Sequence, residues 1–231
     1  DGLAIQGPDF HYDGQKFSKA FDISFINKDG KKENAYQNTW AITTREIGVM
    51  IMMHGDNKGL VIPPKVARKQ VVIVPIYNDS NKIDVIRYAE KVKEMLDGAC
   101  RVYIDSRDEY SPGWKFNEWE MKGTPIRIEA GQREMDQSKI VAVMRHNGEK
   151  ESIDIEKVKE TIPIILERIH NDLYKKAVVV LQAYTHKAES YDELKGIIEN
   201  GGFAQAPWCG SEECEANIKK ETGAKATNMP D

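Results

Sequence analysis

The sequence predicts an α/β (α+β) protein built from three consecutive parts, and three patterns support this prediction. Between Ala35 and His54, β-forming residues give way to apolar residues at helical spacing. The continuous apolar run Val71 to Ile76 is typical of a strand covered on both faces. Beyond residue 153, apolar residues recur every three or four positions, as they do in helices. The expected parts are residues 1–68, 69–150 and 151–231.

The first part is expected to consist of antiparallel strands that lead into a helix. Residues 35–42 favour a strand, and apolar residues from Ile47 onward favour a helix. Arg45 therefore falls in the first helical turn, where the positive end of the helix dipole disfavours a cation. A bound polyanion would remove this conflict, and an ordinary salt bridge to a surface carboxylate is the alternative.

The second part begins after Pro63-Pro64 and the basic residues 65–69, which predict a stiff, solvated connection. Strand-like and helix-like segments then alternate, which indicates a compact α/β domain with a mixed sheet. The expected strands are 71–76, 101–105, 125–129 and 139–145, and the expected helices are 82–97 and 113–123.

The third part is expected to be helical. Its apolar stripe runs from Ile155 to Leu173 and is interrupted by Pro163, which predicts a kink or a new helix start. Further helices are expected at 173–189 and 191–199. Near the end of the chain, Cys209 and Cys214 could both bind one zinc ion, although a structural zinc site usually has four ligands and a pair alone is weak evidence.

Composition narrows the class of protein. The chain has 231 residues, 40% of them hydrophobic, and a net charge of −4, which argues against indiscriminate binding to nucleic acid. Three cysteines are too few for a disulfide framework. No targeting segment and no apolar run of membrane-spanning length is visible, so we expect a cytoplasmic protein without a membrane partner.

Two neighbouring segments resemble the third signature motif of the class II prolyl-tRNA synthetases. They are Thr39-Trp40-Ala41, which leads into Thr44-Arg45-Glu46-Ile47-Gly48, and His54-Gly55-Asp56-Asn57-Lys58-Gly59-Leu60. Upstream, residues 6–17 resemble the histidine loop of the same family and are followed by Ala20-Phe21-Asp22-Ile23. Two positions depart from the family pattern: Asp9-Phe10 replace a Thr-Ser pair, and Ala41 stands where glycine is common.

The second part resembles the anticodon-binding domain of these synthetases, which implies tRNA(Pro) as a partner. The resemblance rests on residues 73–76, 105–107, 111–116 and 122–131. Glu118 and Glu129 could accept hydrogen bonds from a guanine, and Arg107 and Lys115 could donate to its carbonyl or to phosphate. These four are the expected anticodon-binding residues. The aromatic residues Trp114, Phe116 and Trp119 are expected to be packing residues rather than platforms on which bases stack.

The resemblance extends to the C-terminus and implies an archaeal- or eukaryote-like type. Such synthetases carry a small C-terminal zinc domain, in which Cys209 and Cys214 match the first cysteine pair. No later pair occurs before Asp231, so the expected zinc site is half present.

The resemblance implies an architecture and a reaction. We expect 1–68 to be the end of an antiparallel-sheet class II catalytic domain, 69–150 the anticodon-binding domain, and 151–231 a helical connection with a partial zinc-type domain. ATP and Mg²⁺ would serve the activation of L-proline, which is then transferred to tRNA(Pro). Motifs one and two are absent, so we expect this chain to be the C-terminal half of a longer, homodimeric polypeptide.

The same resemblance assigns residues to this reaction. It assigns catalysis to Arg45 and His11, ATP binding to Gln6, Asp9, Thr43 and Arg45, and proline binding to His11, Thr39, Trp40 and Ala41. Two alternatives remain at this point. One is another class IIa aminoacyl-tRNA synthetase, and the other is a non-catalytic relative that binds tRNA or other RNA.

Overall fold

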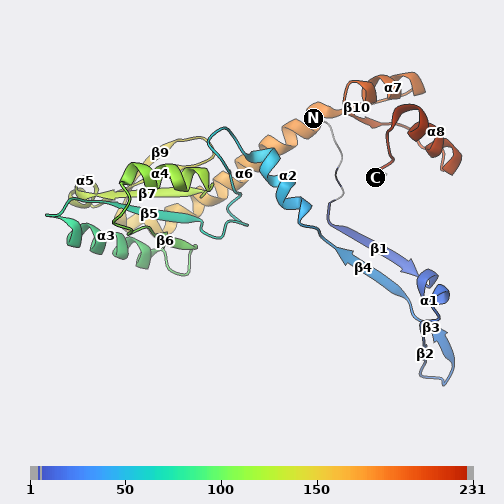
Figure 1. The fold of residues 1–231 in the computed structure, drawn as a ribbon, viewed down its shortest axis with the longest axis horizontal. Coiled ribbons are helices and arrows are strands. Elements are labelled where there is room, and N and C mark those ends of the chain that lie inside the picture. Colours follow the sequence, from blue (N-terminus) through green and yellow to red (C-terminus); the bar gives the residue numbers. More distant parts are fainter. Residues whose placement is uncertain (1–4, 6, 228–231) are drawn as a thin grey trace. The chain divides into compact units, whose positions relative to one another are not determined.

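The computed structural model describes residue 5 and residues 7–227 of the chain (Figure 1). The chain divides into two compact units, one that spans Val49–Leu181 and one formed by the segments on either side of it. The flanking segments and the central unit are therefore described one at a time.

The N-terminal segment is dominated by a two-stranded antiparallel ribbon, β1 (Asp9–Gly14) with β4 (Gln37–Ala41). Between these strands lie the short helix α1 (Lys16–Ala20) and a second hairpin, β2 (Ser24–Ile26) with β3 (Lys32–Asn34). Helix α2 (Arg45–His54) follows β4. The predicted strand before residue 42 and the helix after it are both confirmed.

The central unit is built around a five-stranded sheet in the order β6-β5-β7-β8-β9. Strand β5 is parallel to β6 and β7, whereas β8 is antiparallel to β7 and β9, so the predicted mixed sheet is confirmed. The strands are β5 (Val71–Ile76), β6 (Val102–Ile104), β7 (Ile126–Gly131), β8 (Lys139–Met144) and β9 (Lys150–Asp154). The helices are α3 (Lys82–Met95), α4 (Pro112–Met121), α5 (Gln132–Asp136) and α6 (Val158–Tyr184), the last preceded by the 3-10 turn η1 (Ile155–Lys157).

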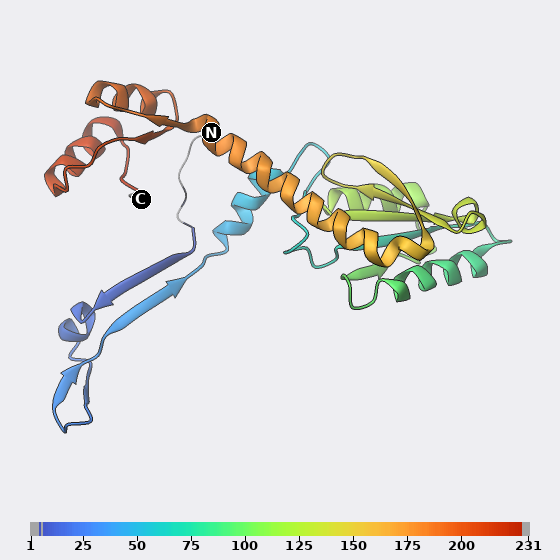
Figure 2. The ribbon, with the colours of Figure 1, turned by 180° about the vertical axis from the view of Figure 1, so that it is seen from behind.

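Helices cover both faces of β5, which explains its continuous apolar sequence. Val71 and Ile73 point into a core shared with α3 and α6, whereas Val72 and Val74 pack against Trp119 of α4 on the other face. Figure 2 shows α3 and α6 together on the first face. Sequence-distant segments thus form one packed unit.

Helix α6 runs through Pro163 as a single element to Tyr184, so the predicted new helix start at Pro163 is wrong, and so is the separate helix expected at 173–189, which overlaps β10. Proline at the sixth helical position removes one backbone hydrogen bond, because only the first four N–H groups of a helix have no intrahelical partner. Burial of the apolar stripe up to Leu173 stabilises the helix against that loss. The core of the central unit therefore continues beyond residue 150, and the predicted domain boundaries stay predictions.

The C-terminal segment contains two short parallel strands and two helices. These are β10 (Thr185–Lys187) with β11 (Phe203–Gln205), and α7 (Tyr191–Glu199) with α8 (Glu212–Thr222). Ser190 and Ser211 cap the two helices by accepting backbone N–H groups of the first turns. The predicted helix at 191–199 is confirmed. Among the described residues, no helix has the length and apolar character needed to cross a membrane.

Candidate functional sites

The β1–β4 ribbon separates the predicted proline-binding residues between its two faces. His11 lies directly opposite Thr39, and Phe10 lies opposite Trp40. Because side chains alternate along a strand, His11 and Thr39 share one face with Ala41, while Trp40 lies on the other. There the Trp40 ring contacts Phe10, with centroids 4.7 Å apart. The ribbon therefore brings three of the four residues together and directs Trp40 away from them.

Three of the predicted ATP-binding residues, Asp9, Thr43 and Arg45, lie at or near one end of the same ribbon. Asp9 shares the His11 face, and its Oδ2 lies 3.1 Å from His11 Nε2. The Thr43 hydroxyl accepts the Arg45 backbone N–H at 3.3 Å and so stabilises the start of α2. Gln6 falls outside the described residues, so the structure adds nothing about it.

Arg45 is the first residue of α2 and is exposed to solvent. In the described part of the chain its guanidinium forms neither an ion pair nor a side-chain hydrogen bond, so the surface salt bridge considered as the alternative is not formed. A free cation at the positive end of a helix is suited to a polyanionic ligand.

In the central unit, a buried carboxylate organises the predicted anticodon-binding residues. The Asp105 side chain is fully buried and accepts two hydrogen bonds from Arg107, Nε to Oδ1 at 2.8 Å and Nη2 to Oδ2 at 2.7 Å. Trp119 Nε1 donates to Asp105 Oδ2 at 2.7 Å. Burial opposes ionisation of this carboxyl, but the hydrogen bonds from Arg107 and Trp119 outweigh it and lower its pKa to about 2. Asp105 therefore holds Arg107 in one orientation.

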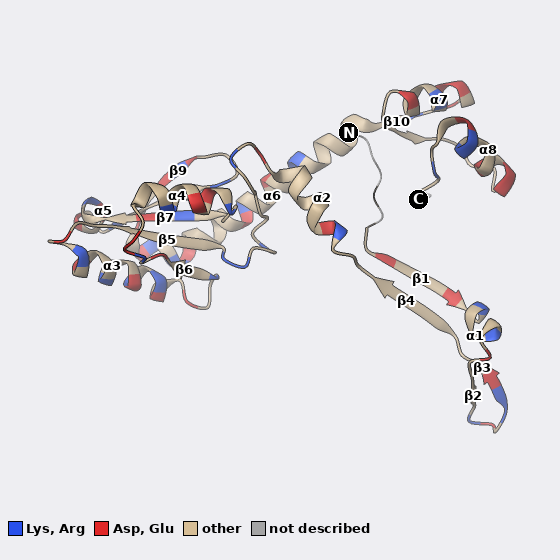
Figure 3. Ribbon diagram, in the orientation of Figure 1, with Lys and Arg blue, Asp and Glu red and all other residues tan. Residues whose placement is uncertain are grey.

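Two more of the four predicted anticodon-binding residues, Glu118 and Lys115, contact Arg107 or Asp105. Arg107 also pairs with Glu118, which in turn pairs with Lys122 Nζ at 2.5 Å. Lys115 is buried, and its Nζ donates to the Asp105 backbone carbonyl at 3.2 Å. The predicted contact of Lys115 with the anticodon stays a prediction, although its burial favours a structural role. Figure 3 shows residues of both charge signs along α4.

Glu129 lies on β7 and has different partners. It accepts from Arg127 Nη2 at 2.9 Å and lies 3.4 Å from Lys150 Nζ. The Arg127 guanidinium also lies over the Phe116 ring, 4.3 Å from its centroid. Glu129 therefore belongs to a second ion-pair group rather than to the Asp105 network.

An exposed aromatic pair beside Arg107 was not anticipated from the sequence. The Tyr110 and Trp114 rings are nearly parallel, with an interplanar angle of 12° and centroids 3.9 Å apart. The Arg107 guanidinium lies 4.9 Å from the Tyr110 centroid and 5.4 Å from the Trp114 centroid. Trp114 is 44% exposed and therefore less buried than a packing residue is expected to be, whereas the packing role is confirmed for the buried Trp119.

Lys69 is a second feature that spacing did not reveal. Its Nζ lies 3.5 Å from the Tyr103 centroid and 4.4 Å from the Trp119 centroid. Burial, followed by the positive charge of Lys122, lowers the pKa of Lys69. The Asp105 network is thus bordered by cations on the α4 side.

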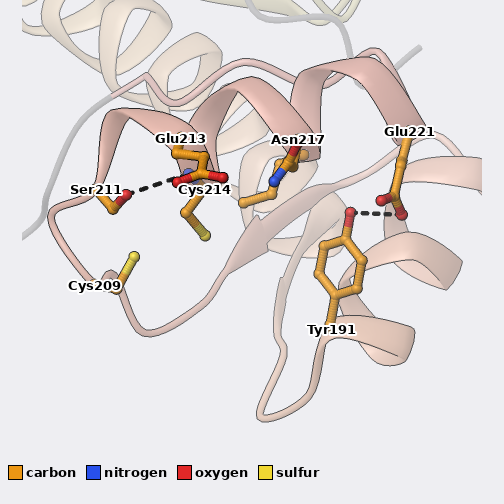
Figure 4. Close-up of a pocket in the computed structure, with 8 residues that line it drawn as sticks. Tyr191, Cys209, Ser211, Glu213, Cys214, Asn217 and Glu221 are labelled. Carbon is orange, nitrogen blue, oxygen red and sulfur yellow. Dashed lines mark hydrogen bonds between the residues drawn. The ribbon is translucent and has the colours of Figure 1, made fainter.

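The cysteine pair lines a pocket in the C-terminal segment together with Tyr191 and Glu221 (Figure 4). The Ser211 backbone N–H and the Cys214 thiol lower the pKa of Cys209, and donation to Cys209 raises the pKa of Cys214. The Tyr191 hydroxyl donates a hydrogen bond to Glu221 Oε2 at 2.9 Å. Within the described residues, no group of three or more metal-ligating side chains is present, and the pair does not make a complete structural zinc site.

Comparison with known proteins defines the class of this chain. A family model for the anticodon-binding domain matches residues 70–163, the region of the mixed sheet and the Asp105 network. A second model, for the prolyl-tRNA synthetase C-terminal domain, matches residues 191–231. The chain therefore contains two regions that match domains of aminoacyl-tRNA synthetases.

Relatives identify which synthetase family this is. The chain is 42% identical to the proline–tRNA ligase of Alkaliphilus oremlandii and 44% identical to proline–tRNA ligase 2 of Bacillus thuringiensis strain Al Hakam, over 231 residues in each case. The crystal structure of prolyl-tRNA synthetase from Cryptosporidium parvum with L-proline and AMP matches 96% of this chain at 41% identity, with a TM-score of 0.83. The chain belongs to the prolyl-tRNA synthetase family. It covers 48% of each of these three proteins, or about half their length.

Proposed function

We propose that the polypeptide containing this chain is a proline–tRNA ligase, which activates L-proline with ATP and transfers it to tRNA(Pro). The observation that carries this proposal is the preorganised Arg107–Glu118 pair on a domain matched by the anticodon-binding family model. In this proposal the central unit binds the anticodon, and the N-terminal ribbon supplies one wall of the pocket for ATP and proline.

The surface around Arg107 supports recognition of an unpaired RNA base. Two hydrogen bonds to Asp105 orient the guanidinium, and the exposed Trp114 ring offers a flat surface beside it. Anticodon bases are recognised in this way when they are splayed from the loop, stacked on aromatic rings and hydrogen-bonded at their edges. Glu118 adds a carboxylate that could accept from a guanine.

The N-terminal ribbon supports a role in positioning the small substrates. Arg45 would neutralise the γ-phosphate end of ATP, and Asp9 and Thr43 would orient the nucleotide. His11, Thr39 and Ala41 would face the proline side. The proline carboxylate attacks the α-phosphate, so the protein needs no nucleophile of its own, and its contribution is to position the reactants and neutralise charge.

Cofactors and assembly complete the proposal. Mg²⁺ is commonly held by substrate phosphates with few protein ligands, so the magnesium ion is proposed to bind together with ATP. A homodimer in the cytoplasm is proposed from the family resemblance. A structural zinc ion is the least supported element, because the described residues supply two thiols of the four ligands required.

The test of this function is proline-dependent ATP–pyrophosphate exchange by the full-length polypeptide. We expect exchange with proline to exceed exchange with histidine, threonine or glycine by at least about a hundredfold, a discrimination that shape and hydrogen bonding can provide. Preference for one of the other three amino acids would favour a different class IIa synthetase. Binding of tRNA without any exchange would favour a non-catalytic relative.

The proposed RNA surface makes a separate prediction for Trp114. Trp114→Ala should weaken tRNA(Pro) binding by about 1–3 kcal/mol, the usual contribution of one stacked base. The measurement is the dissociation constant at fixed salt. The control is Tyr174→Ala, which removes another exposed aromatic ring, on α6. Equal losses in both variants would remove the base-stacking role of Trp114.

A further inference from the structure

The last residue of α2 and the segment that follows it are attached to the end of α4 by a buried arginine. We call residues His54–Leu60 the docking loop. Within it, Asp56 accepts from Arg145 through two hydrogen bonds, Nη1 to Oδ2 at 2.8 Å and Nη2 to Oδ1 at 2.6 Å. Arg145 Nε donates to the Glu120 backbone carbonyl at 2.7 Å. The Arg145 side chain is only 4% exposed, so one guanidinium joins the docking loop to α4.

Backbone contacts reinforce this attachment. Leu60 N–H donates to the Met121 carbonyl at 2.9 Å, and Ile62 N–H donates to the Gly123 carbonyl at 3.2 Å. The docking loop also places Lys58 Nζ 3.0 Å from Glu120 Oε1. Side-chain and backbone bonds therefore converge on the last turn of α4.

Glycines on both sides permit this close approach. Gly59 has φ +128°, and a Cβ there would lie 2.5 Å from the Met121 carbonyl oxygen. Gly123 has φ +71°, and a Cβ there would lie 2.5 Å from the Leu60 carbonyl oxygen. A side chain at either position would strain its backbone and separate the two segments. The contact between the docking loop and the end of α4 therefore depends on close approach of the two main chains.

The same short stretch of α4 also carries a residue of the proposed RNA surface. Glu118, which pairs with Arg107, precedes Glu120 and Met121 by less than one helical turn. The docking loop in turn continues directly from α2, whose first residue is Arg45. A continuous set of bonded residues therefore links Arg107 with the helix that presents Arg45. Such bonded networks are the physical means by which separated sites influence each other.

We propose that Asp56 and Arg145 are positioning residues that couple tRNA binding to the nucleotide helix α2. Anticodon contact at Arg107 and Glu118 biases the last turn of α4, and the Asp56–Arg145 pair transmits that bias through the docking loop. In this proposal the docking loop couples α4 to α2 and does not itself contact substrate. This inference rests on the proposed function above.

The test compares two activities of the full-length polypeptide carrying Asp56→Asn. Asparagine keeps the size of the side chain and its acceptor for the Lys58 N–H, which Asp56 Oδ1 accepts at 2.8 Å, but removes the charge that pairs with Arg145. We expect kcat for tRNA aminoacylation to fall about tenfold, within the usual range of coupling between sites. ATP–pyrophosphate exchange without tRNA and the dissociation constant for tRNA(Pro) should both stay within about twofold of wild type.

A matched control and a second variant keep the test decisive. Asp84→Asn removes a carboxylate from an exposed ion pair on α3 and should leave both activities unchanged. Arg145→Lys should reproduce the selective loss, and combining it with Asp56→Asn should add little, because the two residues act as one pair. Equal loss of exchange and aminoacylation, weaker tRNA binding alone, or no change would each overturn the coupling role. If wild type itself shows no proline-dependent exchange, the proposed function fails instead.

Discussion

Arg45→Ala should lower proline-dependent ATP–pyrophosphate exchange by the full-length polypeptide by about 10²–10³-fold, the usual effect of removing one preorganised group that stabilises developing charge. The reason is structural: Arg45 begins α2, is exposed, and its side chain has no ion pair within the described residues. Its cation is therefore available to phosphate. The measurement is the exchange rate at varied concentrations of ATP and of proline. We expect KM for ATP to rise more than KM for proline.

Arg87→Ala provides the control for Arg45. Arg87 is an exposed arginine on α3, paired at 3.4 Å with Asp84 three residues earlier, and its loss should leave exchange unchanged. Unaltered exchange in Arg45→Ala would remove the assignment of this residue to ATP. Equal reduction in both variants would instead point to a general effect of lost positive charge.

Asp105→Ala should destabilise the protein by about 2–4 kcal/mol, because it leaves the buried Trp119 N–H without an acceptor and Arg107 without its main carboxylate. Chemical denaturation monitored by tryptophan fluorescence measures the loss. Asp108→Ala is the control, since the Asp108 side chain is 59% exposed and its removal should destabilise the protein clearly less than removal of Asp105. A similar cost in both variants would contradict the central role of Asp105.

The pH dependence of stability gives an independent check on Asp105. Its pKa in the folded protein is about 2, below the ordinary value of 3.8, so its ionised form is favoured by folding. The resulting stabilisation is present above about pH 4 and is lost as pH falls toward 2. Asp105→Asn should therefore flatten the stability profile in this window.

Local patterns in the sequence predicted the regular elements well. The apolar run at β5 and the helical spacing of α2 depend on neighbouring residues, and the structure has both where they were expected. A kink or a new helix start was predicted at Pro163 because proline is a strong local signal, and the apolar stripe that stabilises α6 through this residue acts through tertiary packing. Strands β10 and β11 were missed because each has three residues, too few for a visible period.

Candidate site residues were predicted less completely than the fold. Resemblance identified Arg107 and Glu118, but the carboxylate that fixes them, Asp105, is recognised only from its burial and bonds. A sequence gives the type of a lysine and not its depth, so the burial of Lys115 could not be foreseen. The exposure of Trp114 was missed for the same reason, since large aromatic side chains are usually buried.

The register of the β1–β4 ribbon has a consequence for how the N-terminal segment tolerates changes in length. A single inserted residue before Tyr12 would shift the pairing by one position and exchange the two faces, so that His11 would leave Thr39 and join the side of Trp40. The irregularity between Tyr12 and Gly14 marks where strict pairing ends. Changes in length are therefore compatible with this site beyond that bulge, in the β2–β3 hairpin. An added residue there leaves His11 on the same face of the ribbon as Thr39.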